Sequence, residues 1–460
     1  MEVSFMKNRN YSLWALSWPI FIELFLQFLL GAADTFMVSE ISDDAVAVVG
    51  FSHQLFNALT VLFTVIASGA GILIAQKLGA RKEEDARSIS IIALKTTVLI
   101  GAAISVLLIA LPGPIASLLQ MPEELLPLAR TYISIVGGSM ILAAIMSTLS
   151  AAIRNTGNTR GPMYTAIGMN VVHIFLNYGF IYGAFGLPEW GLAGVAISTV
   201  VSRLLASALL VYMFLFAFER RIWWGDIKLW SRSLFREILR IGWPLGVYSG
   251  NWVLSQLVIF TFIGTLGAAQ LAARTYMNTL ESFCFLIGFS IALATQIRVA
   301  HLFGAGNTRE AYKDAYKGLW IGQLVVIANS FIIFLFGSQA LGLFTSDPDI
   351  LAICAGLLGL NLLLQPGKML NMTIADSLNA VGDTRFTMYV STISMWGVAV
   401  LVSYFFSIHL GYGLTAIYIC MIADEYLRGF VCWLRWRSFK WASRAGSPEL
   451  PAQGAAAAEA

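Results

Sequence analysis

The sequence has few charged residues, because Asp, Glu, Lys and Arg make up only 12% of its 460 positions. This is about half of the 25% that is typical of soluble domains. Hydrophobic residues make up 58%, and the mean hydropathy is +0.75. A soluble chain of this length would form two or more domains, and this composition cannot give them polar surfaces. The sequence therefore predicts an integral membrane protein.

The motifs of enzymes and of metal sites are also missing. There is no GxxxxGKS/T, no HExxH and no GxSxG, so we expect no enzymatic activity and no catalytic residues. The net charge of +3 gives no indication of nucleic-acid binding. Four cysteines without metal-like spacing are interpreted as small buried hydrophobic residues: Cys284, Cys354, Cys420 and Cys432. We expect no metal site, and no cofactor other than a coupling ion, H⁺ or Na⁺.

Long apolar segments are plentiful. A helix needs about 20 mainly apolar residues to cross the hydrocarbon core of a bilayer. Because non-helical backbone has no partners in lipid and alternating barrel strands are absent, the segments predict an all-α fold. Twelve are predicted, at residues 12–38, 51–76, 90–112, 128–152, 163–184, 191–216, 238–264, 275–300, 315–337, 350–379, 387–408 and 412–434.

Lys and Arg concentrate near the N-terminus, in the even-numbered connections, in the central linker and in the tail. The odd-numbered connections carry mostly acids, with Arg130 and Arg274 as exceptions. The positive-inside rule then predicts a multi-pass protein of the cell membrane with both termini cytoplasmic. No small-residue cleavage site follows the first apolar run, so we expect no cleaved signal peptide.

Short motifs recur at one offset of 225 residues. Pro19 matches Pro244, ILIAQKLGA at 72–80 matches IRVAHLFGA at 297–305, and TGNTRGPMY at 156–164 matches VGDTRFTMY at 381–389. The repeat predicts two pseudo-symmetric six-helix lobes. The predicted parts are an N-terminus (1–11), an N-lobe (12–216), a linker (217–237), a C-lobe (238–436) and a tail (437–460) whose end is disordered. The linker is interpreted as an amphipathic helix or as a basic topogenic loop.

Ionisable groups inside apolar helices are costly and usually functional. The first and fifth segments each place three polar groups on one helix face, and Asp34 and Asn177 lie at similar depths. A carboxylate facing amides and an imidazole suits a proton site, so Asp34 is predicted as the coupling carboxylate; the alternative is a purely structural hydrogen-bond cluster. The predicted ion-coupling set is Asp34, Asn177, His173, Asn170, Glu23 and Gln27.

Pro19 lies four residues before Glu23 and removes a backbone hydrogen bond, so it is predicted as a hinge or a static kink. In the second half, Glu281 suits a substrate cation. Lys368 and Asp376 lie eight residues apart on roughly one helix face, and could pair with an acid across the bundle. The predicted substrate-binding set is Glu281, Asn251, Asp376 and Lys368.

An ordered set of motifs over residues 11–435 resembles the multidrug and toxic compound extrusion (MATE) family. They are PIFIELFLQFLLGAADTFMVS, GAGILIAQKLGA, RNTGNTRGPMY, HIFLNYGFIYG, GWPLG, QIRVAHLFGAG and NAVGDTR. The resemblance implies twelve helices in two lobes and export of organic cations in exchange for protons or sodium ions. It also implies that Asp34 of the first segment and the pair His173 and Asn177 of the fifth segment form the ion site of the N-lobe.

The sequence departs from the family pattern at three positions. His173 stands where the family usually has Asn, and Trp252 and Lys368 stand where the sodium-coupled branch has acids. A cation in place of an anionic ligand argues against a sodium site in the C-lobe. The resemblance with these departures favours protons over sodium.

The expected function is therefore a secondary antiporter that exports small organic cations by alternating access. The alternative is a flippase for a lipid-linked saccharide or related amphiphile, for which a basic cavity is expected. A receptor or scaffold fits poorly with two polar-lined lobes. We expect organic cations and membrane lipids as partners, and a monomer.

Overall fold

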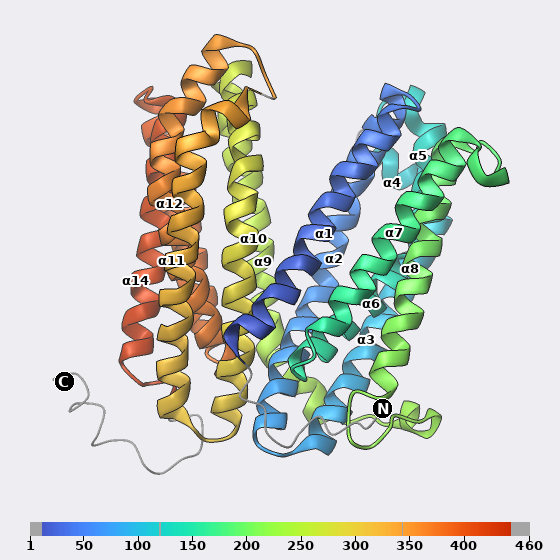
Figure 1. Ribbon diagram of the computed structural model, residues 1–460, viewed down its shortest axis with the longest axis vertical. Helices are drawn as coiled ribbons and strands as arrows, with labels where there is room; N and C mark the ends of the chain where they lie inside the picture. The colour runs from blue at the N-terminus through green and yellow to red at the C-terminus, as the bar shows by residue number, and fades with distance from the viewer. Residues whose placement is uncertain (1–11, 119–120, 343, 443–460) are drawn as a thin grey trace. The chain divides into compact units, whose positions relative to one another are not determined.

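The computed structural model describes residues 12–118, 121–342 and 344–442. Every regular element among them is a helix (Figure 1), so the all-α prediction is confirmed. The elements are α1 (Leu13–Ser39), α2 (Asp43–Gly79), α3 (Glu83–Ala110), α4 (Pro112–Leu118), η1 (Glu123–Leu125), α5 (Leu126–Gly138), α6 (Met140–Asn155), α7 (Arg160–Tyr182), η2 (Ala184–Gly186), α8 (Gly191–Leu215), η3 (Trp224–Lys228), α9 (Arg232–Thr265), α10 (Ala268–Gly304), α11 (Thr308–Leu341), α12 (Pro348–Ala380), α13 (Thr384–Ser394), η4 (Met395–Val402), η5 (Phe405–His409) and α14 (Gly413–Arg437).

Within the described residues, nine helices are long and apolar enough to cross a membrane, or ten if α5 and α6 form one bent span. The run α13–η4–η5 counts as one of them. Helices α7 and α14 are long enough, with 23 and 25 residues, but they carry more polar side chains. Most of the predicted apolar segments are therefore shown to be membrane-type helices.

Several helices begin before their apolar runs. α2 and α10 begin at Asp43 and Ala268, against predicted starts at 51 and 275. Polar helix ends continue past the hydrocarbon, and acidic side chains in the first turn of α2 complement the helix dipole. The predicted segment 128–152 is interrupted at Ser139, where α5 and α6 meet at 40°.

The sequence repeat is also a repeat of backbone structure. α2 and α10 have 37 residues each, and both their first and last residues are 225 apart. Gly157 and Gly382, again 225 apart, have φ of 91° and 82°. Glycine adopts this conformation without the steric cost that a Cβ would add, so the same turn follows α6 and α12.

The described residues fall into two compact units. The first contains Ile22–Leu78 and Lys82–Gly246, and the second contains the described parts of Tyr11–Phe21, Gly79–Arg81 and Val247–Ala460. The division crosses α1 and α9 two residues after Pro19 and two residues after Pro244, respectively. The two prolines thus mark equivalent points in the repeat.

Each unit has its own hydrophobic core. In the first unit, α6 packs against both α3 and α8, and α7 lies along α8 (Figure 1). A Cβ at Gly242 of α9 would collide with the Val65 carbonyl of α2, so glycine allows this close approach. In the second unit, α12 packs against α10, α11 and α14.

The linker has two interpretations from the sequence, an amphipathic helix and a basic loop, and the structure has no continuous helix over 217–237. The linker contains only the short 3₁₀ helix η3, and α9 begins within it at Arg232. The turn is held by a side chain, because Asp226 accepts a hydrogen bond from Trp223 N (2.7 Å) and forms an ion pair with Arg87 of α3. Both the N-terminus 1–11 and the predicted disordered end of the tail lie outside the described residues.

Candidate ion-coupling and substrate sites

A buried polar cluster joins α1 to α7 in the first unit. The Asp34 Oδ1 atom lies 2.6 Å from His173 Nε2 and accepts a hydrogen bond from Asn177 Nδ2 at 3.0 Å. Their exposed fractions are 7%, 2% and 0%, respectively. His173 and Asn177 are four residues apart, so one face of α7 presents both to Asp34. The predicted facing of these three side chains is present in the structure.

The other imidazole nitrogen limits how protons are arranged. His173 Nδ1 lies 3.2 Å from Ser202 Oγ on α8, and Ser202 can donate its hydroxyl proton to Thr199 O at 3.0 Å. In this first arrangement Ser202 Oγ accepts a hydrogen bond from His173 Nδ1–H, and a second proton is shared between His173 Nε2 and the Asp34 carboxylate. If Ser202 donates to Nδ1 instead, Nε2–H donates to an ionised Asp34. The Asp34–His173 pair therefore has states that differ by one proton.

Sequence reasoning missed Ser202, which is one of three serines of α8, because helix spacing does not say which of them meets His173. The residue after Ser202 on α8 is Arg203, which donates to Ser139 Oγ at 3.0 Å. A cation is thus the next residue along the helix from the serine that contacts His173.

Three members of the predicted ion-coupling set lie apart from this cluster. Asn170 donates to Ala166 O of its own helix (2.8 Å). Glu23 forms a buried ion pair with Arg154 of α6, at 2.9 Å. Gln27 is exposed. Helical spacing places these residues on one face with Asp34 or His173, but it does not say which neighbour that face meets, and the exposed Gln27 does not point into the bundle as expected.

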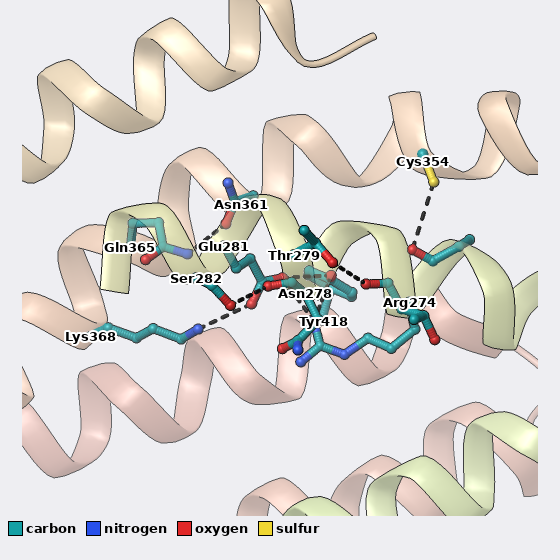
Figure 2. A network of polar contacts seen from close by, with 12 residues as sticks. Arg274, Asn278, Thr279, Glu281, Ser282, Cys354, Asn361, Gln365, Lys368 and Tyr418 are labelled. Carbon is teal, nitrogen blue, oxygen red and sulfur yellow. Dashed lines mark hydrogen bonds and ion pairs between the residues drawn. The ribbon is translucent and has the colours of Figure 1, made fainter. Parts of the chain in front are cut away.

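A second network lies in the other unit (Figure 2). Glu281 of α10 accepts from Arg274 Nη1 at 2.8 Å, from Tyr418 Oη at 2.6 Å and from Lys368 Nζ at 3.1 Å. Figure 2 shows Lys368 of α12 approaching the carboxylate from one side, with Arg274 and Tyr418 on the other. Arg274 and Glu281 are buried, with exposed fractions of 2% and 3%.

This network corrects two predictions. Glu281 does not offer a free carboxylate to a substrate cation, because two cations of the chain already engage it. Arg274 was assigned to an outer connection, but it is buried within α10, which begins at Ala268 rather than at 275. Lys368 pairs with an acid across the bundle, as predicted, although that acid could not be named. Asn251 instead donates to Thr392 Oγ1 of α13.

Replacing Glu281 with Gln is expected to lower the free energy of unfolding by about 3–5 kcal/mol, because it leaves two buried cations without their counter-charge. The apparent melting temperature in detergent measures this. The double variant Glu281→Gln/Lys368→Met removes one of the two cations and should recover part of the loss. If the double variant melts no higher than the single variant, the Lys368–Glu281 contact does not contribute to stability.

A cavity of about 320 Å³ lies in the same unit. Its walls carry one carboxylate, Asp376 of α12, and aromatic rings that include Trp252, Phe285 and Phe289. Asp376 accepts only long hydrogen bonds, from Gln296 Nε2 and Asn379 Nδ2 at 3.3 Å each. Unlike Glu281, it has no salt bridge within the described chain. An acid beside aromatic faces is a suitable site for an organic cation.

Comparisons with known proteins agree with this architecture. The MatE family model matches twice, at residues 19–179 and 244–405. An uncharacterized transporter, YisQ of Bacillus subtilis (strain 168), is 34% identical over 434 residues, covering 94% of this chain and 95% of the relative. A probable multidrug resistance protein NorM of Thermotoga maritima is 29% identical, covering 94% and 92%. A crystal structure of a MATE protein in the bent conformation matches with a TM-score of 0.86 at 20% identity, covering 95% and 96%. With a family model that matches both halves and a helical membrane architecture, the chain belongs to the MatE family of multidrug efflux transporters.

Proposed function

We propose that this protein is a secondary antiporter that exports organic cations in exchange for protons, with Asp34 as the coupling carboxylate. In this proposal twelve helices cross the cell membrane in two lobes, and both termini are cytoplasmic. The positive charge of the even-numbered connections supports this orientation.

The observation that carries the proposal is the contact of Asp34 with His173 and Asn177. The two side-chain atoms that contact Asp34 Oδ1 are both nitrogens, His173 Nε2 at 2.6 Å and Asn177 Nδ2 at 3.0 Å. Sodium is a hard cation that prefers several oxygen ligands, whereas a carboxylate–imidazole pair holds or releases a proton directly. The geometry therefore favours protons as the coupling ion.

The cavity beside Asp376 supports a cationic substrate. Its aromatic walls attract a cation through the ring faces, and Met372 adds a flexible apolar contact. The proposed cycle loads a proton at Asp34 from the outer side as the cation leaves. The proton then departs to the cytoplasm, and a new cation binds. Pro19 supports a bend in α1, because it removes a backbone hydrogen bond within a helix of 27 residues.

The proposal is tested with purified protein in liposomes loaded with ethidium. A pH gradient alone is expected to accelerate ethidium efflux, and a sodium gradient alone is expected to accelerate it little. Protein-free liposomes are the control. Transport driven by sodium and not by pH would contradict proton coupling, and transport driven by neither would contradict the antiporter itself.

An anionic amphiphile is the second candidate substrate, as expected for a flippase of lipid-linked saccharides. It is favoured by the second unit's network, in which Arg274 and Lys368 supply two positive charges and Glu281 supplies one negative charge. The surplus cation could meet a phosphate or carboxylate. Replacement of Lys368 by Met distinguishes the candidates, because it should weaken binding of an anionic amphiphile and leave ethidium binding nearly unchanged.

A further inference from the structure

A second cavity lies in the first unit, away from the ion cluster and from Asp376. It has a volume of about 260 Å³, below the range of about 300–1,000 Å³ that suits drug-sized ligands. Apolar side chains from α3 and α8 form half of its lining, and the linker contributes four of the ten lining residues. The lining comprises Ile91, Leu94, Lys95, Val211, Phe214, Leu215, Arg221, Ile222, Trp223 and Asp226.

Two of the lining residues are cations without an acid. Lys95 Nζ donates to Leu229 O at 3.1 Å and lies 5.6 Å from the centre of the Trp230 ring. The Arg221 guanidinium lies 4.4 Å from the ring centre of Phe216. Among the described residues neither cation has a salt-bridge partner, whereas the neighbouring Arg220 faces Glu84 at 3.7 Å. The cavity thus combines an apolar wall with two uncompensated positive charges.

The one acid in the wall does not cancel these charges. Asp226 forms its ion pair with Arg87 of α3. The Arg87 guanidinium, which donates to this carboxylate, and the hydrogen bond from Trp223 N lower the pKa of Asp226 below its ordinary value. The carboxylate therefore stays ionised at neutral pH. Arg87 also pairs with Glu84 at 3.0 Å, and Glu84 faces Arg220 at 3.7 Å, so these two acids and two arginines balance one another. Lys95 and Arg221 remain available to an anion.

The position of the cavity indicates where that anion comes from. Lys95 follows Glu83 by 12 residues, about 18 Å along a helix that crosses the membrane. A lysine at such a depth is costly unless its charge reaches the interface or a partner. Trp223 and Trp230 are 65% and 53% exposed, as is common for tryptophan at the membrane–water boundary. These exposed tryptophans beside the cavity are the basis for placing its opening at the level of the lipid head groups.

We propose that this cavity, which we call the linker cavity, binds one anionic phospholipid from the leaflet on the linker side. The phosphate meets Lys95 and Arg221, and part of one acyl chain enters the wall formed by α3 and α8. Anionic lipids are attracted to basic segments at the cytoplasmic surface, and the apolar wall excludes a free phosphate as the preferred ligand. The inference does not depend on the coupling ion or on the exported substrate.

Lipid retention by the full-length protein in detergent tests this, with native mass spectrometry as the readout. Wild type is expected to retain one phosphatidylglycerol, and to bind it at least tenfold more tightly than phosphatidylcholine. The variant Lys95→Met/Arg221→Met should lose about 25-fold in affinity for phosphatidylglycerol, since each of the two cations contributes about fivefold. The matched control Arg220→Met, which removes a charge that already faces Glu84, should change it less than twofold.

A cavity-filling variant, Leu94→Trp, keeps both cations and should also lose the bound lipid. Thermal melting of each variant shows whether it is folded, and only folded variants are compared. Equal binding of both lipids, equal effects of Arg220→Met and Arg221→Met, or displacement by millimolar inorganic phosphate would each overturn the proposal. Unchanged lipid binding in folded Leu94→Trp would overturn it as well.

Discussion

Liposomes that carry the Asp34→Asn variant are expected to show no pH-driven ethidium transport above the level of protein-free liposomes. The substitution keeps the size and the hydrogen-bonding capacity of the side chain beside His173 and Asn177, but it removes the group that ionises. A proton can shift the transporter between its states only if it binds one state more tightly than the other. Without the carboxylate there is no such binding site, so a proton gradient cannot drive the change. Efflux after an imposed pH jump, followed by ethidium fluorescence, measures the effect.

Two comparisons separate loss of coupling from general damage. Glu40→Gln neutralises an exposed acid just after the end of α1 and should transport like wild type. Asp34→Asn should still bind ethidium with an affinity within about threefold of wild type, because Asp376 lies in the other compact unit. An Asp34→Asn protein that transports at the wild-type rate would refute the coupling role of this carboxylate.

The second large effect is expected at the aromatic cavity. Asp376→Asn should weaken ethidium binding about tenfold, equivalent to about 1.4 kcal/mol, because it removes the negative charge from a cavity lined by apolar and aromatic groups. Trp252→Ala should weaken binding by about fivefold, since a cation over an aromatic face contributes about 0.5–2 kcal/mol. Fluorescence titration of detergent-solubilised protein gives both dissociation constants.

Asp349→Asn is the matched control, since Asp349 lies in the first turn of the same helix α12 and is exposed. It should bind ethidium like wild type. Equal affinities of wild type and Asp376→Asn would show that the organic cation binds elsewhere. The melting temperature of Asp376→Asn shows whether the variant is folded. It should be close to that of wild type, because Asp376 accepts only two hydrogen bonds, of 3.3 Å each.

The repeat shows how two units of similar backbone acquire different chemistry. Glu23 and Arg154 form a buried ion pair in the first unit. Their counterparts 225 residues later are Tyr248 and Asn379, which both line the cavity around Asp376. The first unit thus has an ion pair at these two positions, whereas the second unit has two neutral side chains that line a cavity. The scaffold repeats because backbone-shaping residues repeat, whereas each polar site is particular to its unit.

Much of the fold follows from the sequence alone. Long apolar runs dictate helices because lipid offers no partner for unpaired backbone groups, and the prolines and glycines spaced by 225 dictate the repeat. The spacing of His173 and Asn177 placed both on one face of α7, and similar depths in the membrane predicted that Asp34 would face them. Local periodicity and hydrophobicity are sufficient for these features.

Only the tertiary structure decided which polar faces meet. Glu23 and Arg154 are 131 residues apart, and Glu281 and Tyr418 are 137 apart; no pattern in the sequence joins them. The linker is another case, because its sequence left a helix and a loop open, and the structure has a short 3₁₀ helix in which Asp226 contacts Arg87 of α3. Helical periodicity fixes the direction in which a side chain projects from the axis of its helix. Its partner depends on how whole helices pack, which the summed shapes of many side chains determine.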